Sequence, residues 1–366
     1  MPDKSYMKFA LDLARKGEGW TSPNPMVGSV IVKNGCIVGR GYHQKAGTPH
    51  AEVHALHMAG KEAKGATVYV TLEPCCHIGR TPPCTEALIN AGVKKVVVAA
   101  IDPNPSVAGK GIKRLREAGI EVITGVMEDE AKQLNEVFNK HIVSQMPFIS
   151  VKSALTLDGK TATKTGSSQW ITGTEARKYA HRLRHKYSAV MVGIGTVLTD
   201  NPRLTTRIEK ENLKNPTRVV IDSSLKIPGN AHVLNTEEAP TLIYTAGNVD
   251  REKYSLVKEK GGEIIECPGR EGKVDLLQVT KDLYHRGITS ILVEGGAAIN
   301  GSLLDRRLID KVYLFMAPKI VGSNNSPGVF GGVGVQNIND AIALKNMKVE
   351  KIGEDFLFIG YPVFKE

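Results

Sequence analysis

One histidine, one glutamate and two cysteines constrain this chain more than any other feature of its sequence. His50 and Glu52 stand one residue apart, and Cys75 and Cys84 follow with eight residues between them. One imidazole, two thiolates and an open fourth position are typical of a catalytic zinc site rather than a structural one. Such a site activates water near neutral pH, and Glu52 is the candidate carrier of its proton. We therefore predict that His50, Cys75 and Cys84 bind zinc.

A structural zinc site is the alternative interpretation of this cluster. It needs a fourth protein ligand, and only Cys76 or His77 is close enough in sequence to supply one. A structural site would also leave Glu52 without a role. His54 and His57 share a helical face with the predicted ligand, but the thiols already complete the set. We interpret both histidines as packing or surface residues.

The other cysteines and the N-terminus point to a reducing compartment. The chain has five cysteines, three of them in one segment, which is not the pattern of a disulfide framework. Cys36 and Cys267 are expected to be buried, inert thiols. The N-terminus lacks the basic and then apolar layout of a signal peptide. Because no apolar run reaches the roughly 18 residues of a membrane span, we expect a cytoplasmic protein.

Length and charge narrow the class of protein further. At 366 residues the chain is too long for one average core, so two domains are expected. A net charge of +10 favours anionic partners, which include phosphorylated small molecules, nucleotides and nucleic acid. Charge alone does not choose among these three.

Hydrophobic periodicity predicts an α/β protein with a domain boundary at residues 146 and 147. In the first half, helices are predicted over 4–16, 50–63, 84–91, 109–118 and 128–144, and strands over 29–32, 36–39, 66–72, 95–101 and 120–124. This alternation indicates a largely parallel sheet core. In the second half, strands are predicted over 148–154, 189–192, 218–222, 241–245 and 290–293, and helices over 174–186 and 297–304.

Three shorter features of the sequence are ambiguous or weak signals of a binding site. Asn24 lies between prolines and is either a turn residue or an amide that holds a polar substrate edge beside the zinc. The pair Gly193 and Gly195 is weak evidence for a dinucleotide site, because the third glycine is missing. Gly295 and Gly296 precede a helix, where backbone amides either cradle a cofactor phosphate or form a plain turn.

Several motifs together carry a resemblance to a known family. They are Asn24-Pro25-x-Val27-Gly28, His50-Ala51-Glu52, Thr71-Leu72-Glu73-Pro74-Cys75-x-His77-x-Gly79-x-Thr81-Pro82-Pro83-Cys84 and Asp102-Pro103-Asn104-Pro105. With them the chain resembles the bifunctional riboflavin-biosynthesis deaminase/reductase family over nearly its whole length. The long gap between the thiols distinguishes it from generic cytidine deaminases, although the general zinc deaminase pattern is a known one. Cys76 departs from the family, which usually has serine there.

For residues 1–146 the resemblance implies a cytidine-deaminase-like three-layer domain. Its reaction would be hydrolytic removal of the 2-amino group from 2,5-diamino-6-(5-phosphoribosylamino)pyrimidin-4(3H)-one. The resemblance assigns zinc to His50, Cys75 and Cys84, and it makes Glu52 the catalytic proton carrier between water and the leaving ammonia. The positions that match substrate contacts are Asn24, His43, His77, Arg80 and Asn104.

For residues 147–366 the resemblance implies a dihydrofolate-reductase-like domain that uses NADPH. It would reduce the ribosyl group of 5-amino-6-(5-phosphoribosylamino)uracil to a ribityl group. Matching cofactor positions are Ala154, Trp170, Thr196, Asp200, Ser223, Gly296, Ala297, Ala298, Ile299, Asn300, Gly301 and Ser302. Matching substrate positions are Ser168, Arg184, Leu204, Arg207 and Glu294. The predicted catalytic residues of this half are Lys152, Asp200 and Glu294.

Two alternatives stay open at this point. Arg184 and Arg207 suit a phosphate clamp, but the basic neighbours of Arg184 also fit a solvated helix face. The +10 charge also allows a zinc nucleoside or RNA deaminase with an inactive second domain. The composition argues against nucleic-acid binding, because aromatic residues make up only 5% of the chain and no arginine-rich stripe is interleaved with them. We expect phosphorylated pyrimidine substrates, no nucleic acid or membrane partner, and a homo-oligomer.

Overall fold

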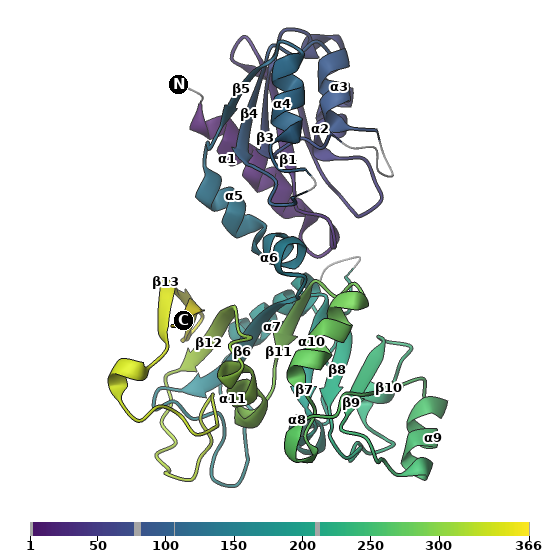
Figure 1. The fold of residues 1–366 in the computed structure, drawn as a ribbon. Coiled ribbons are helices and arrows are strands. Elements are labelled where there is room, and N and C mark those ends of the chain that lie inside the picture. Colours follow the sequence, from purple (N-terminus) through teal and green to yellow (C-terminus); the bar gives the residue numbers. More distant parts are fainter. Residues whose placement is uncertain (1–2, 77–81, 106, 209–212, 366) are drawn as a thin grey trace. The chain divides into compact units, whose positions relative to one another are not determined.

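The computed structural model describes residues 3–76, 82–105, 107–208 and 213–365. The chain separates into two compact units, Met1–Met146 and Pro147–Glu366 (Figure 1). Each unit has its own sheet, and each is described by itself.

The sheet of the first unit is mixed, not largely parallel. Its strands are β1 (Gly28–Lys33), β2 (Cys36–Tyr42), β3 (Thr67–Leu72), β4 (Lys95–Ala100) and β5 (Glu121–Thr124), in the order β2-β1-β3-β4-β5. β3, β4 and β5 are parallel, whereas β1 is antiparallel to both of its neighbours. The hairpin between β1 and β2 accounts for one of these antiparallel pairs, because a two-residue turn joins only antiparallel strands.

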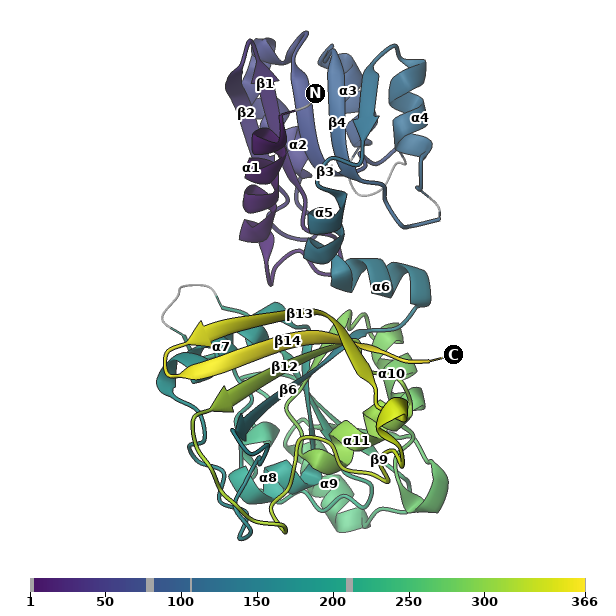
Figure 2. The ribbon, with the colours of Figure 1, turned by 90° about the vertical axis from the view of Figure 1, so that its left-hand side faces the viewer.

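Helices cover both faces of this sheet and form three layers. They are α1 (Lys4–Ala14), α2 (Ala51–Ala59), α3 (Cys84–Asn90), α4 (Lys110–Glu117), α5 (Glu128–Leu134) and α6 (Glu136–Ser144). Successive strand residues point to opposite faces. Val68 and Val70 of β3 pack in the core with α2, α3 and α4, while Tyr69 packs in the core with α1 and α5 (Figure 2). The predicted three-layer α/β arrangement is confirmed.

Two further predictions, on helix continuity and on cysteine burial, are wrong. The helix expected over 128–144 is broken at Asn135, whose buried side chain accepts a hydrogen bond from Met26 N and donates one to Met26 O. This tertiary contact competes with helix continuation, and the periodicity does not reveal it. Cys36, expected to be buried, is exposed because it begins β2 beside the hairpin turn, whereas Cys267 is buried as predicted.

The second unit contains a nine-stranded sheet in the order β10-β9-β8-β7-β11-β6-β12-β14-β13. The strands are β6 (Phe148–Thr156), β7 (Ala189–Gly193), β8 (Thr217–Ile221), β9 (Thr241–Thr245), β10 (Glu263–Glu266), β11 (Ser290–Val293), β12 (Lys311–Ala317), β13 (Ala343–Ile352) and β14 (Asp355–Val363). The strands from β10 to β12 are parallel, and β14 and β13 complete the sheet as an antiparallel ribbon (Figure 2).

The helices of the second unit are α7 (Thr174–Lys186), α8 (Ile194–Asp200), α9 (Arg251–Glu259), α10 (Leu276–His285) and α11 (Ala297–Asp305). The helix predicted over 174–186 is confirmed. Gly193 and Gly195, read as a weak dinucleotide signal, stand at the start of the short helix α8. Across the described parts of both units, no helix has the length and apolar character needed to cross a membrane.

Glu73 ties the segment that carries Cys75 to the rest of the first unit. It follows β3 directly, and its buried carboxylate accepts the backbone N–H groups of Asp102, Gly109, Gly111 and Ile112 at 2.9–3.3 Å. A side chain at position 111 would collide with the backbone oxygen of Pro74, so the approach of α4 requires glycine there. One carboxylate therefore fixes the start of α4 against the end of β3.

We predict that Glu73→Gln lowers the free energy of unfolding of the first unit by about 3 kcal/mol, because an amide group turns N–H donors toward buried N–H groups. Denaturant unfolding of the full chain measures this. The matched control is Glu121→Gln, whose carboxylate makes an exposed ion pair with Lys95. A change of less than about 1 kcal/mol is expected there, and an equal loss in both variants would contradict the anchoring role of Glu73.

Candidate functional site

The three predicted zinc ligands lie together in the first unit. The ligand atoms of His50, Cys75 and Cys84 all lie within 4.8 Å of one another, and among the described residues this is the group found able to hold a metal. His50 Nδ1 is 3.2 Å from Cys84 Sγ and 3.6 Å from Cys75 Sγ. Tetrahedral zinc with bonds of 2.0–2.3 Å would separate its ligands by about 3.6 Å. Nitrogen and sulfur ligands at these separations fit zinc.

Two helix starts and one strand end bring these ligands together. His50 is the residue before α2, Cys84 is the first residue of α3, and Cys75 follows β3. The backbone N–H of Cys84 donates to Cys75 Sγ at 3.4 Å. Hydrogen bonds from Cys84 and His50 lower the pKa of Cys75. A thiolate at this position suits metal binding.

Glu52 lies in the first turn of α2, and 3% of it is exposed. Burial raises the pKa of Glu52 to about 7, and the nearby Cys75 adds to this increase. A carboxyl group near neutral pKa can both accept and donate a proton. The neighbouring His54 and His57 lie outside the metal group, as predicted.

Asn24 and His43 form a polar pair beside the metal group. Asn24 Nδ2 is 3.1 Å from His43 Nε2, and His43 Nδ1 is 3.2 Å from the backbone oxygen of Pro49. Because that oxygen can only accept, Nδ1 carries the proton and Nε2 accepts from the Asn24 amide. The His43 ring meets the His50 ring edge-on at 5.4 Å.

The other predicted substrate contacts of the first unit are less fully defined. Asn104 lies in the loop after β4, where its backbone N–H donates to Asp102 Oδ1. His77 and Arg80 lie outside the described residues.

The second unit contains a cavity of about 900 Å³. Its wall includes many predicted reductase residues: Lys152, Ala154, Ser168, Trp170, Arg184, Thr196, Asp200, Leu204, Arg207, Glu294, Gly296, Ala297, Ala298 and Asn300. Burial raises the pKa of Asp200, and a hydrogen bond with Ser168 opposes this increase. The cavity therefore collects side chains from distant parts of the sequence.

Four predicted cofactor residues are not part of the cavity wall. Gly301 packs against the backbone, since a side chain there would lie 2.2 Å from Gly331 O. Ile299 is buried, and Ser223 Oγ accepts the backbone N–H of Val274. Ser302 is likewise absent from the wall. Ile299, Gly301 and Ser302 lie on α11. Because a helix shows only one side to a cavity, the continuous run 296–302 cannot line the cavity throughout.

The Asn300 side chain supports a polar ligand in this cavity. Its Nδ2 donates to Val329 O at 2.9 Å, and its buried Oδ1 has no hydrogen-bond partner among the residues that the structure describes. Gly296 adds an open helix start, where a side chain would meet nothing within 4 Å. A buried acceptor without a donor and a helix start with no side-chain cap fit a polar cofactor such as NADPH.

Glu294 organises the charged part of the cavity. Its carboxylate accepts two hydrogen bonds from Arg184, at 2.6 and 3.0 Å, and lies 3.7 Å from Lys152 Nζ. Burial alone would raise the pKa of Glu294, but Arg184 and Lys152 hold it down at about 2. Burial lowers the pKa of Lys152. The side chain of Arg184 is only 13% exposed, so the solvated-face interpretation of this residue is wrong.

His181 and Arg177 are cavity residues that the sequence reasoning missed. Both lie on α7 with Arg184, at intervals of four and three residues, and therefore on one helical face. That spacing was the available signal. Arg177 also packs over the Trp170 ring at 4.7 Å.

We predict one zinc ion per chain in the purified protein and less than a tenth of that in Cys84→Ala, because three-ligand binding does not survive the loss of a thiolate. Elemental analysis against protein concentration measures this. Cys76→Ser is the matched control and should keep full occupancy. Loss of zinc in the control instead would move the metal site to Cys76.

Comparisons with known proteins agree with this division of the chain. Residues 147–358 match the model of the RibD C-terminal domain, and residues 1–100 match the zinc-binding region of cytidine and deoxycytidylate deaminases. The two matches fall on the cavity-bearing unit and on the metal-bearing unit respectively.

Relatives also match over nearly the full length. The riboflavin biosynthesis protein RibD of Aquifex aeolicus is 50% identical over 97% of both chains. The structure of Acinetobacter baumannii RibD is 38% identical, with a TM-score of 0.87 over 99% of both chains. The diaminohydroxyphosphoribosylaminopyrimidine deaminase/5-amino-6-(5-phosphoribosylamino)uracil reductase of Thermotoga maritima is 39% identical, with a TM-score of 0.86 over 98% of both chains. The chain therefore belongs to the RibD family of riboflavin biosynthesis proteins.

Proposed function

We propose that this chain carries out two consecutive steps of riboflavin biosynthesis at two separate sites. Residues 1–146 deaminate the phosphoribosylated diaminopyrimidinone, and residues 147–366 reduce the ribosyl group of the product with NADPH. The observation that carries this proposal is the pairing, in one chain, of the metal group around Glu52 with the Glu294 cavity. A nucleoside or RNA deaminase with an inactive second domain is not favoured, because the second unit matches a reductase family.

In the deamination step, Glu52 moves the proton. Bound zinc, held by His50, Cys75 and Cys84, supplies the activation of water that hydrolysis requires. The Glu52 carboxylate takes a proton from water and gives one to the departing amino group, and the burial of Glu52 raises its pKa and so favours its acting as a proton donor. Asn24 presents its amide oxygen to a polar edge of the pyrimidine, while His43 holds its amide nitrogen.

In the reduction step, the protein aligns the sugar with the cofactor. Bound NADPH supplies the hydride. Lys152 orients and polarises the sugar carbon that receives it, and the depressed pKa of Lys152 favours proton release. Glu294 holds Lys152 and Arg184 in position through its ion pairs. Asp200 and Ser168, which contact each other, lie in the same cavity wall.

We predict that Glu52→Gln slows ammonia release by at least about 100-fold, because general acid–base catalysis is lost. NADPH oxidation with the deaminated intermediate should stay within about twofold. Lys152→Met should give the reverse result, and it leaves the two hydrogen bonds between Arg184 and Glu294 available. Parallel assays of ammonia and of NADPH absorbance measure both rates.

Glu62→Gln is the control, since Glu62 makes an exposed ion pair with Lys33 on the same unit as Glu52. Both of its rates should equal those of the wild type. Loss of both activities in Glu52→Gln would argue against separate sites.

We also propose that the chain forms a homodimer through one face of the β13–β14 ribbon, here called the ribbon face. It consists of Leu344, Met347, Val349 and Phe356, which are 37–58% exposed. On the opposite face, the β14 residues Leu357 and Ile359 are buried, at 0% and 7% exposed. Nine of the ten residues of β13 are exposed, and this strand lies at the sheet edge.

A second copy is the occupant that this surface fits best. Two strands of this length present roughly 300 Å² in projection, and the largest apolar patches on protein surfaces, which are often functional, begin at about this size. An unpaired edge strand next to an apolar face is self-complementary about a twofold axis. A cytoplasmic location stays a prediction of the sequence.

We predict that the wild type elutes with twice the chain mass of 39.6 kDa and that Val349→Glu elutes as a monomer, because the substitution buries a charge in the contact. Light scattering after size exclusion measures the mass. Val143→Glu is matched in chemistry and exposure, 61% against 58%, but lies on α6 and should remain dimeric. A monomeric wild type, or a dimeric Val349→Glu, would contradict the proposal.

A further inference from the structure

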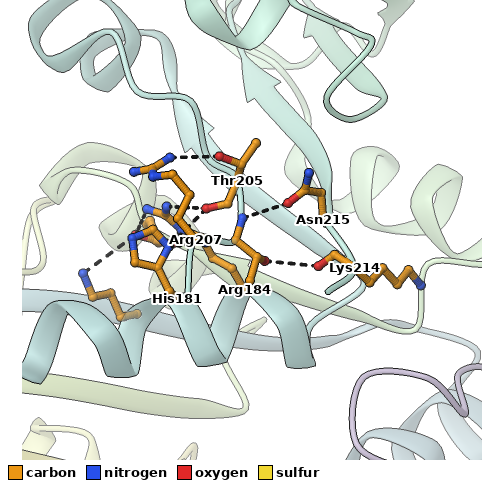
Figure 3. Close-up of polar contacts among 9 residues, drawn as sticks. His181, Arg184, Thr205, Arg207, Lys214 and Asn215 are labelled. Atoms are coloured by element: carbon orange, nitrogen blue, oxygen red, sulfur yellow. Dashed lines mark hydrogen bonds and ion pairs between the residues drawn. The ribbon is translucent and has the colours of Figure 1, made fainter. Parts of the chain in front are cut away.

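The cavity of the second unit has a corner made by one helix and one loop. α7 contributes His181 and Arg184, and the facing loop contributes Thr205 and Arg207 (Figure 3). This loop is held from behind, where the Thr206 N–H donates to Asn215 Oδ1 at 2.9 Å. The corner therefore has a defined geometry without any ligand.

Arg184 has little capacity left for a substrate phosphate. Its Nε and one terminal nitrogen donate to Glu294, and the other terminal nitrogen donates to Thr205 O at 3.0 Å. The Glu294 carboxylate also neutralises its charge. A guanidinium committed in this way positions other groups more than it binds an added anion.

Arg207 is the less committed cation of this corner. Among the described residues, its guanidinium has one hydrogen-bond partner, Thr205 Oγ1 at 2.9 Å. Arg207 is exposed at the cavity wall, where it can reach an anionic group. One guanidinium provides only part of the hydrogen bonds that a phosphate accepts, so neighbouring donors matter.

The contacts of His181 determine which ring nitrogen carries its proton. His181 Nδ1 is 3.2 Å from the Arg207 backbone N–H and 3.2 Å from Thr205 O. The N–H group can only donate and the carbonyl can only accept, so Nδ1 satisfies one of them. Thr205 O already accepts from Arg184, whereas the Arg207 N–H has no other acceptor in the described parts of the chain. Nδ1 is therefore the acceptor, and the proton lies on Nε2.

The surrounding charges keep His181 neutral. Burial lowers the pKa of His181 to about 4, and the cations Arg184 on its own helix and Arg207 on the loop contribute, against the weaker opposing effect of Glu294. Nε2 has no partner among the described residues and is not a buried unpaired atom, so it is accessible at the cavity wall. At neutral pH the ring presents an unused N–H donor there.

We propose that His181 is a substrate-binding residue of the reductase site, which donates its Nε2–H to the substrate phosphate next to Arg207. This inference rests on the proposed reduction of a phosphorylated substrate. A neutral donor adds a hydrogen bond without adding a third cation to the corner. The backbone N–H of Arg207 holds the ring by donating to Nδ1, so the Nε2–H donor needs little rearrangement on binding.

The variants His181→Asn and His181→Gln separate the two ring positions. Glutamine can place an N–H donor near the position of Nε2, whereas asparagine reaches only the position of Nδ1. In the full chain, His181→Asn should raise the KM for the phosphorylated intermediate by about 10- to 100-fold, the loss expected for a hydrogen bond to a charged group. His181→Gln should restore the KM to within about threefold of the wild type, and kcat should change little in either variant.

The same intermediate without its phosphate is the decisive comparison. Its KM should be unchanged in both variants, since the group that meets His181 is missing. An equal increase in KM with and without the phosphate would assign His181 a structural role, and an unchanged KM for both substrates would also overturn the proposal. Failure of the wild type to oxidise NADPH would instead refute the proposed function itself.

A measurement on the wild type covers the case in which the variants do not fold. Diethyl pyrocarbonate modifies accessible neutral imidazoles, and mass spectrometry reports the rate at each histidine. Inorganic phosphate should slow modification of His181 several-fold compared with chloride at equal ionic strength. The exposed His57 is the internal control and should not be protected. Equal rates at His181 in phosphate and chloride would contradict the contact.

Discussion

A buried glutamate placed directly after a parallel strand is the interaction on which each unit depends. Glu73 follows β3 and Glu294 follows β11. A carboxylate loses its hydration when it is buried, so it needs several strong partners nearby. Glu73 obtains them from four backbone N–H groups, and Glu294 obtains them from Arg184 and Lys152. The same requirement therefore produces a rigid support in one unit and an array of charges in the other.

This difference in partners explains why Glu73 supports the fold of its unit, whereas Glu294 belongs to the chemistry of its cavity. Partners that are backbone groups cannot move without unfolding α4, so Glu73 holds the Cys75 segment in a single geometry. Partners that are side chains leave protons and charges near a cavity, so the Glu294 cluster can respond to a ligand. The carboxyl ends of parallel strands suit both purposes, because loops from neighbouring strands converge there. The Cys75 segment accordingly follows the end of β3, and the second site combines the segment after β11 with residues of β6.

Much of this arrangement was predictable from residues that act locally. The helix starts at His50 and Cys84 and the strand before Cys75 follow from periodicity and from proline at a helix start, so the metal group could be predicted. The break at Asn135 could not, because its cause is a hydrogen-bonded pair with Met26, over a hundred positions earlier in the chain. The exposure of Cys36 depends on which strand end faces solvent, and a thiol gives no signal for that.

The sequence by itself determined the zinc chemistry, the two-domain division and the family, because these depend on residue types at short, fixed spacings. Only the tertiary structure decided which cation in the cavity of the second unit pairs with Glu294. Arg184 and Arg207 look equivalent in the sequence, yet Glu294 occupies one and leaves the other available. It also decided that His181 joins them, with Nδ1 beside the backbone N–H of Arg207. Such outcomes depend on distances between segments far apart in the chain, which no local pattern encodes.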